Sequence, residues 1–110
     1  MTIRFENRDI EDEDGYLIHF SDWNEALAAY LAEREDIKLE QDHWEIIRII
    51  RGYYEKYEFS PMLKVLFSLI AGEKGMEKNK ASQLFYQLFP NGPLQQAFKI
   101  SGLPKPKSCV

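Results

Sequence analysis

Apolar residues recur at intervals of three and four in five stretches of the chain, a spacing that places them on one face of an α-helix. Proline and glycine interrupt the pattern between stretches, most sharply at Ser60-Pro61 and at Phe89-Pro90-Asn91-Gly92-Pro93. A proline suits the first turn of a helix, and a glycine such as Gly102 suits the left-handed position after its last turn. The sequence therefore predicts helices over about 22–34, 41–57, 61–71, 80–88 and 93–101.

The first 20 residues follow a different pattern. Ile3 and Phe5 alternate with polar neighbours, and Tyr16-Leu17-Ile18 follows an acidic turn that ends at Gly15. Alternation with a period of two is typical of a half-buried strand. We expect a small β hairpin or meander here, packed on the helices, and hence an α+β fold with about five α-helices.

The chain has 110 residues, 45% of them apolar, and we expect a single domain. It should comprise the β unit over 1–20, a helical body over 21–101 and a C-terminal arm over 102–110. We find no apolar run long enough for a membrane span and no signal-peptide pattern, so we expect no membrane association. One cysteine cannot form an internal disulfide, which favours a reducing compartment, the cytoplasm.

Acidic and histidine residues offer weak candidate sites. The acidic run over 11–14 lacks the spacing of a calcium loop, and two histidines with one cysteine lack zinc-ligand spacing. His43 could act as a base toward a thiol, but its place at the start of the second predicted helix favours a capping or core-edge role. We expect neither a metal nor a cofactor.

Charge is divided unevenly along the chain. Residues 1–60 carry 16 acidic and 7 basic side chains, whereas residues 61–110 carry 2 and 7. A basic C-terminal half could approach a polyanion or an acidic partner, or could be an ordinary solvated surface. A helix-turn-helix nucleic-acid-binding protein is one alternative, disfavoured by an eight-residue connection over 72–79 and by few basic groups in 80–90.

The chain ends in Leu103-Pro104-Lys105-Pro106-Lys107-Ser108-Cys109-Val110, where prolines alternate with lysines. Because proline restricts its own backbone and that of the residue before it, we expect an extended, mobile arm that carries Cys109 about 20 Å from Gly102. A thiolate there could take a sulfur atom from another protein's persulfide. The two lysines favour the thiolate and the terminal carboxylate opposes it, so the direction of the net pKa shift stays open. The chemistry of the residues alone leaves two alternatives open. The cysteine could carry sulfur, or the protein could be an interaction domain whose cysteine has no chemical role.

The C-terminal third of the chain resembles the DsrC/TusE family. The matching residues are Leu88-Phe89-Pro90, Gly92-Pro93, Gln96-Ala97, Lys99-Ile100, Gly102-Leu103-Pro104-Lys105-Pro106 and Cys109-Val110. Further matches lie upstream, at Gly15-Tyr16-Leu17, Trp23, His43-Trp44-Glu45, Arg51, Tyr54 and Ser60-Pro61. The ending, with its cysteine next to last, is the most specific of these motifs.

The resemblance implies a sulfur carrier that holds a persulfide on Cys109, a sulfurtransferase-type relay component rather than a stand-alone catalyst. The DsrC branch, a partner of dissimilatory sulfite reductase, has a second cysteine eleven residues upstream, where this chain has Phe98. That difference favours the TusE branch over the DsrC-like alternative. The TusE branch implies a TusBCD-type sulfur donor complex and an MnmA-type tRNA thiolase as partners, with tRNA contacted mainly through the thiolase during 2-thiouridine synthesis at the wobble position.

Overall fold

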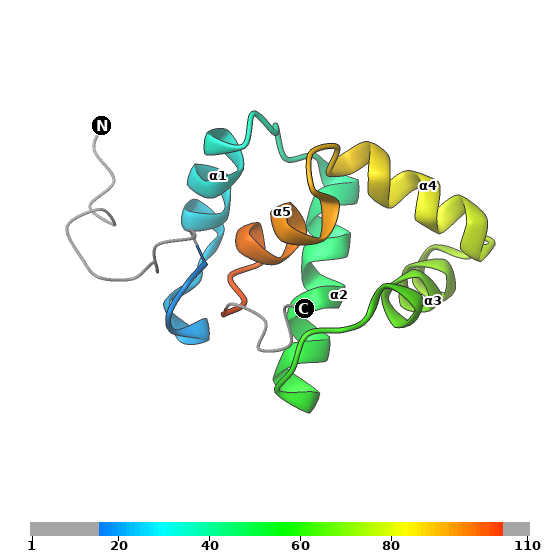
Figure 1. Ribbon diagram of the computed structural model, residues 1–110, viewed down its shortest axis with the longest axis horizontal. Helices are drawn as coiled ribbons and strands as arrows, with labels where there is room; N and C mark the ends of the chain where they lie inside the picture. The colour runs from blue at the N-terminus through cyan, green and yellow to red at the C-terminus, as the bar shows by residue number, and fades with distance from the viewer. Residues whose placement is uncertain (1–15, 105–110) are drawn as a thin grey trace.

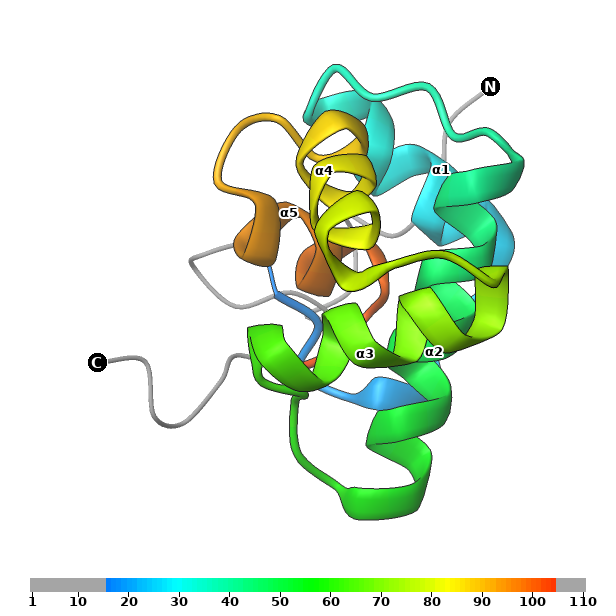
Figure 2. The same ribbon diagram turned by 90° about the vertical axis from the view of Figure 1, so that its right-hand side faces the viewer.

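The computed structural model describes residues 16–104, and within them the chain is helical (Figure 1). The elements, in chain order, are the 3-10 helix η2 (Phe20–Asp22) and the α-helices α1 (Glu25–Arg34), α2 (Gln41–Tyr57), α3 (Leu63–Lys74), α4 (Lys78–Leu88) and α5 (Pro93–Ile100). Helix α5 contacts α1, α2 and α4, while α3 packs on α2 and α4. The last helix therefore joins the two halves of the fold, with α1 on one side and the α3–α4 pair on the other (Figures 1 and 2).

The predicted α+β fold is wrong, because residues 16–104 contain five α-helices and no strand. Leu17 forms only an isolated bridge, and the chain turns into η2 three residues later. Tyr16 and Leu17 are 6% and 0% exposed, so these apolar residues serve burial against the helices rather than a sheet face. The remainder of the expected β unit, residues 1–15, lies outside the described part of the chain.

The helix predictions agree best for α2, whereas α3 begins at Leu63, after the predicted start at Ser60-Pro61. Helix α2 has the predicted bounds, and a capping box between Glu40 and His43 begins it. Helix α1 begins later than predicted, because the side chain of Asn24 accepts a hydrogen bond from the Leu27 amide at 2.8 Å. Asp22, at which the predicted helix begins, belongs to η2 instead.

The connection between α3 and α4 is shorter than predicted. Helix α3 continues through Gly72 to Lys74, and α4 begins at Lys78, so residues 75–77 join them rather than the eight over 72–79. Gly75, with φ of 65°, ends α3 in the left-handed conformation that glycine tolerates.

The core lies where α5 meets the other helices. Its fully buried large side chains are Leu17, Leu27, Ile46, Ile47, Ile50, Leu66, Ile70, Phe85, Phe89, Phe98, Ile100 and Leu103. Two of them, Phe85 and Phe89, lie 5.4 Å apart between ring centroids, and Phe67 adds a T-shaped contact to Phe85 at 5.7 Å. Because Ile100 and Leu103 are among these buried side chains, the end of the described chain is packed against the helices.

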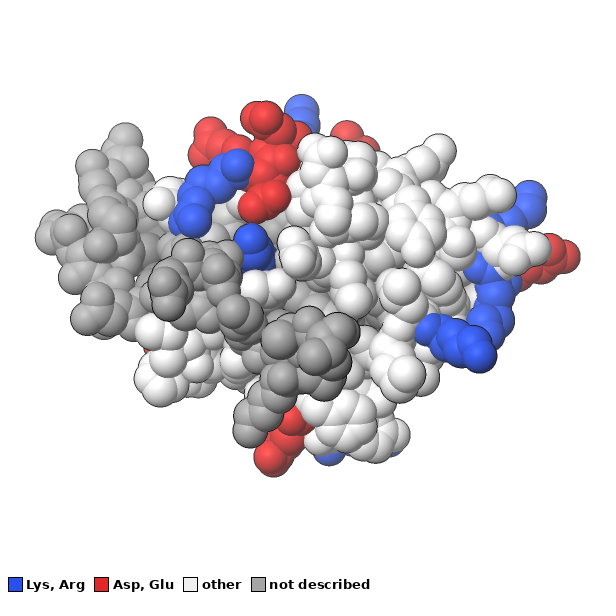
Figure 3. All heavy atoms as spheres, viewed as in Figure 1, with Lys and Arg blue, Asp and Glu red and all other residues white. Residues whose placement is uncertain are grey.

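The charged side chains are also distributed unevenly over the surface of the molecule. Acidic side chains gather over the connection between α1 and α2, and basic ones near the end of the α3–α4 pair (Figure 3). Between them, much of the surface over α4 and α5 in this view is uncharged. Exposed large apolar residues include Phe59 and Met62, at 56% and 70% exposure.

Candidate functional site

Cys109, the predicted sulfur-bearing residue, lies outside the described part of the chain, which reaches Pro104. The structure does describe the segment from which the C-terminal residues leave the body. We call residues 100–103 the arm root. Its geometry decides the point in space from which a group on Cys109 is tethered.

The arm root is a helix end closed by hydrogen bonds of its own. The Gly102 amide donates to the Lys99 carbonyl at 3.1 Å, and the Leu103 amide donates to the Phe98 carbonyl at 3.1 Å. Gly102 has φ of 78°, which confirms the predicted left-handed cap. This pair of bonds is the Schellman arrangement, and Leu103, 0% exposed, supplies the apolar contact that usually accompanies it.

Trp23 holds the arm root from the start of the fold. Its indole Nε1 donates to the carbonyl of Ile100 at 2.8 Å. The ring also lies directly against Gly102, where an added Cβ would come within 2.7 Å of the Trp23 Cγ. Glycine is therefore required at 102 for two reasons, its positive φ and the contact with the indole.

Arg51 holds the next carbonyl from α2. Its Nη1 donates to the Ser101 carbonyl at 2.9 Å. The guanidinium carbon lies 3.8 Å from the centroid of the Phe20 ring and 4.2 Å from that of Trp23. Burial lowers the pKa of Arg51 and the nearby charge of Glu55 opposes this, but a guanidinium stays protonated in proteins. A fixed positive charge at the C-terminal end of α5 also interacts favourably with the negative end of the helix dipole.

A pocket of about 350 Å³ opens beside this contact. Trp23 and Arg51 form one wall, and Trp44, Arg48 and Glu55 contribute to the rest. Arginines and glutamates both line it, so its charge is mixed and selects no ligand by sign.

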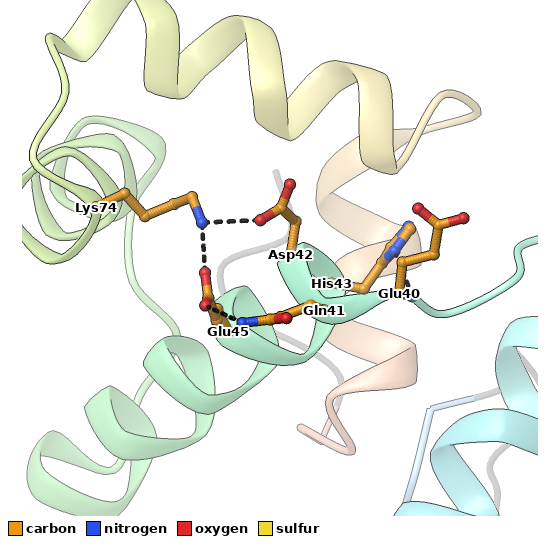
Figure 4. Close-up of polar contacts among 6 residues, drawn as sticks. All are labelled: Glu40, Gln41, Asp42, His43, Glu45 and Lys74. Carbon is orange, nitrogen blue, oxygen red and sulfur yellow. Dashed lines mark hydrogen bonds and ion pairs between the residues drawn. The ribbon is translucent and has the colours of Figure 1, made fainter.

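His43 is a structural residue. It is 6% exposed, its Nδ1 accepts from the Glu40 amide at 3.0 Å, and its Nε2 lies 3.0 Å from the Leu88 carbonyl, to which it donates (Figure 4). The proton therefore sits on Nε2 in this arrangement. The bond at Nδ1 caps α2, which confirms the predicted capping role, and the bond at Nε2 joins α2 to the end of α4.

Lys74 makes a second polar link between helices. Its ammonium pairs with Asp42 at 2.8 Å and with Glu45, and these bonds tie the end of α3 to the start of α2 (Figure 4). The hydrogen bonds that Lys74 donates to Asp42 and Glu45 raise the pKa of Lys74, and the bond to Glu45 lowers the pKa of Glu45. The link positions helices rather than a reacting group.

The described part of the chain, residues 16–104, contains no helix that is long and apolar enough to cross a membrane. Nor does it bring together three histidine, cysteine or acidic residues that could hold a metal ion.

Comparison with known proteins identifies the family. The model of the family described as DsrC like protein matches residues 4–110. The chain belongs to the DsrC-like family. Within it, sulfurtransferase TusE of Photorhabdus laumondii is 49% identical over 107 residues, covering 96% of both chains. Sulfurtransferase TusE of Escherichia coli is 45% identical over 107 residues, covering 96% of this chain and 97% of its own.

Solved structures of DsrC-like proteins share the fold. DsrC of Allochromatium vinosum superimposes with a TM-score of 0.77 at 40% identity, covering 91% of this chain and 88% of its own. The oxidized gamma-subunit of dissimilatory sulfite reductase (DsrC) from Archaeoglobus fulgidus gives 0.77 at 38% identity, covering 90% of each chain.

The roles of Trp23 and Arg51 were missed by reasoning from the sequence, although both residues belonged to the family resemblance. The contacts that define those roles join residues 77 and 50 positions apart in the chain. Neither periodicity nor spacing carries information over that separation. One signal was available for Arg51, which stands at helical spacing from Trp44, Ile47 and Tyr54 on the apolar face of α2.

Proposed function

We propose that this protein is a sulfur carrier that accepts sulfur as a persulfide on Cys109 and passes it on for tRNA 2-thiouridine synthesis at the wobble position. The observation that carries the proposal is the family match, which runs to residue 110 and so includes Cys109, the only thiol of the chain. The TusE relatives at 45% to 49% identity support the sulfurtransferase role.

The proposed chemistry needs one thiol and no oxidant. The Cys109 thiolate attacks the outer sulfur of a donor persulfide, a new S–S bond forms, and the donor's S–S bond breaks to release the donor as a thiolate. Cys109 then carries –S–SH. In the second step an acceptor thiolate attacks that outer sulfur, and Cys109 leaves as a thiolate. Each molecule is loaded and discharged once per cycle, so the protein acts as a stoichiometric carrier.

Phe98 supports a carrier with a single thiol. It occupies the position at which the DsrC branch has its second cysteine, and here it is a core residue, 2% exposed. With one cysteine, no disulfide can form within the chain. This separates the proposed role from that of a DsrC-like partner of sulfite reductase.

A relay component requires a donor and an acceptor of sulfur, and we propose a TusBCD-type complex and an MnmA-type tRNA thiolase, in the cytoplasm. Exposed apolar residues such as Phe59 and Met62 offer contact area for protein partners. The three-residue connection over 75–77 removes one objection to a helix-turn-helix protein, but Lys78 and Lys80 are the only basic residues of α4, which is few for a helix that enters a groove. Contact with tRNA through the thiolase fits this surface better.

Intact-mass measurement tests the proposal. The protein is incubated with a cysteine desulfurase, its sulfur source and the donor complex, and we expect the mass to rise by one sulfur atom. Cys109→Ser should gain none. As a matched control, the double variant Ser108→Cys/Cys109→Ser keeps one thiol and moves it by one residue, and it should load and discharge more slowly. A wild-type protein without added sulfur, or a control that transfers as fast as wild type, would contradict the proposal.

A further inference from the structure

Two side chains from distant parts of the chain grip consecutive carbonyls of the arm root. Trp23 donates to Ile100 and Arg51 donates to Ser101, at 2.8 and 2.9 Å. These are the last backbone carbonyls of α5 and its cap, directly before the segment that leads to Cys109. These two hydrogen bonds therefore lie at the base of the C-terminal segment that carries Cys109 in the proposed function.

The grip completes the end of α5 with side chains from outside that helix. The Gly102 and Leu103 amides bond to the Lys99 and Phe98 carbonyls, whereas the next two carbonyls, those of Ile100 and Ser101, accept from Trp23 and Arg51. Carbonyls at a helix end can also bond to water. Here the guanidinium of Arg51 is instead placed over the rings of Phe20 and Trp23 while it reaches Ser101. Planar stacking and a forked donor are properties of arginine that lysine does not share.

We propose that Arg51 and Trp23 are positioning residues for sulfur transfer, which fix the arm root so that Cys109 is tethered at a constant point on the body. The inference rests on the proposed carrier function. Neither side chain touches the reacting sulfur in this proposal; both act through the backbone of residues 100–103.

The effect of a fixed root follows from tether length. Cys109 is six residues beyond Leu103 in the sequence, and a chain of that length spans at most about 20 Å. If the root is released back to Phe98, the tether becomes eleven residues long. Effective concentration falls roughly as the −3/2 power of tether length, so the thiol's concentration at a docked partner's site should fall about two- to threefold.

Kinetics of Arg51→Gln test the proposal. Once a partner is docked, transfer is an intramolecular step, so we expect kcat for discharge to the acceptor to fall about two- to threefold while KM stays unchanged. Loading from cysteine persulfide, a small donor that needs no docking, should keep its wild-type rate. Arg51→Lys should recover part of the loss, since an ammonium can still donate to the Ser101 carbonyl.

Control variants separate positioning from general damage. Arg48→Gln removes the same charge from the same pocket, on an exposed side chain, and should transfer at the wild-type rate. Trp23→Phe keeps an aromatic ring but loses the indole N–H, and should reproduce the kcat defect even if Arg51→Gln folds poorly. Circular dichroism and thermal melting verify the fold of each variant.

The outcomes are distinct from those that bear on the carrier function itself. A wild-type protein that takes up no sulfur contradicts the carrier function. A wild-type protein that loads, with Arg51→Gln and Trp23→Phe transferring equally fast, overturns the positioning role. So does a variant whose rate falls as much with cysteine persulfide as with the protein partners, because the defect would then be in the thiol and not in its placement.

Discussion

At the scale of single residues, Gly102 carries the tightest constraint in the described chain. Two other glycines, Gly75 and Gly92, also have positive φ, at 65° and 66°. Only at Gly102 would a side chain collide with an aromatic ring, since a Cβ at Gly75 would meet nothing within 4 Å and one at Gly92 only Gln95 at 3.5 Å. Gly102 therefore both ends α5 and allows close contact between the arm root and Trp23.

We therefore expect Gly102→Ala to lower the free energy of unfolding by about 3 kcal/mol, from left-handed backbone strain and from displacement of the indole. Gly75→Ala is the matched control and should cost about 1 kcal/mol, because it carries the strain without the collision. Urea unfolding of the three proteins measures both values. Equal losses at the two positions would show that the contact with Trp23 contributes nothing.

At the scale of elements, the helices were largely predictable from the sequence, whereas the contacts between them were not. Helix α2 followed from its periodicity and from the residues at its ends, and Gly102 from its place after the fifth stretch. The strand expected at Tyr16-Leu17 failed because a short apolar run reports burial without reporting backbone conformation. The contacts of Trp23 and Arg51 were out of reach, since they depend on how α5 packs against the start of the fold.

The link between α2 and α3 predicts a pH dependence. Lys74 lowers the pKa of Glu45 from its usual 4.5, so the stabilisation is present above that value and is lost as the pH falls through the lower pKa of the folded state. We expect the stability difference between wild type and Lys74→Met to shrink from about pH 7 to pH 3. Urea unfolding across this range measures it. Lys64→Met, on the exposed surface of the same helix, is the control, and a difference that does not depend on pH would contradict the role of the pair.

At the scale of the whole molecule, Phe98 stands at a core position. It is 2% exposed and lies within α5, the helix that contacts α1, α2 and α4. A thiol in its place would therefore replace a filled part of the core.

Phe98→Cys should cost about 3 kcal/mol in unfolding free energy, because a large buried side chain is replaced by a small one. We also expect its thiol to react with a thiol reagent only when urea unfolds the protein, as burial shields it and raises the pKa of a cysteine in apolar surroundings. Ser68→Cys, on the exposed face of α3, should react at once in the native protein. Equal reaction rates of the two introduced cysteines would show that position 98 is open to solvent.

The central place of α5 also orders events during synthesis. Helices α1 and α2 leave the ribosome first, but the faces that they turn toward α5 are covered only after Phe98, Ile100 and Leu103 have been made (Figure 1). The core can therefore be completed only once α5 has left the ribosome. A chain cut short before Pro93 would leave those faces uncovered and open to proteases.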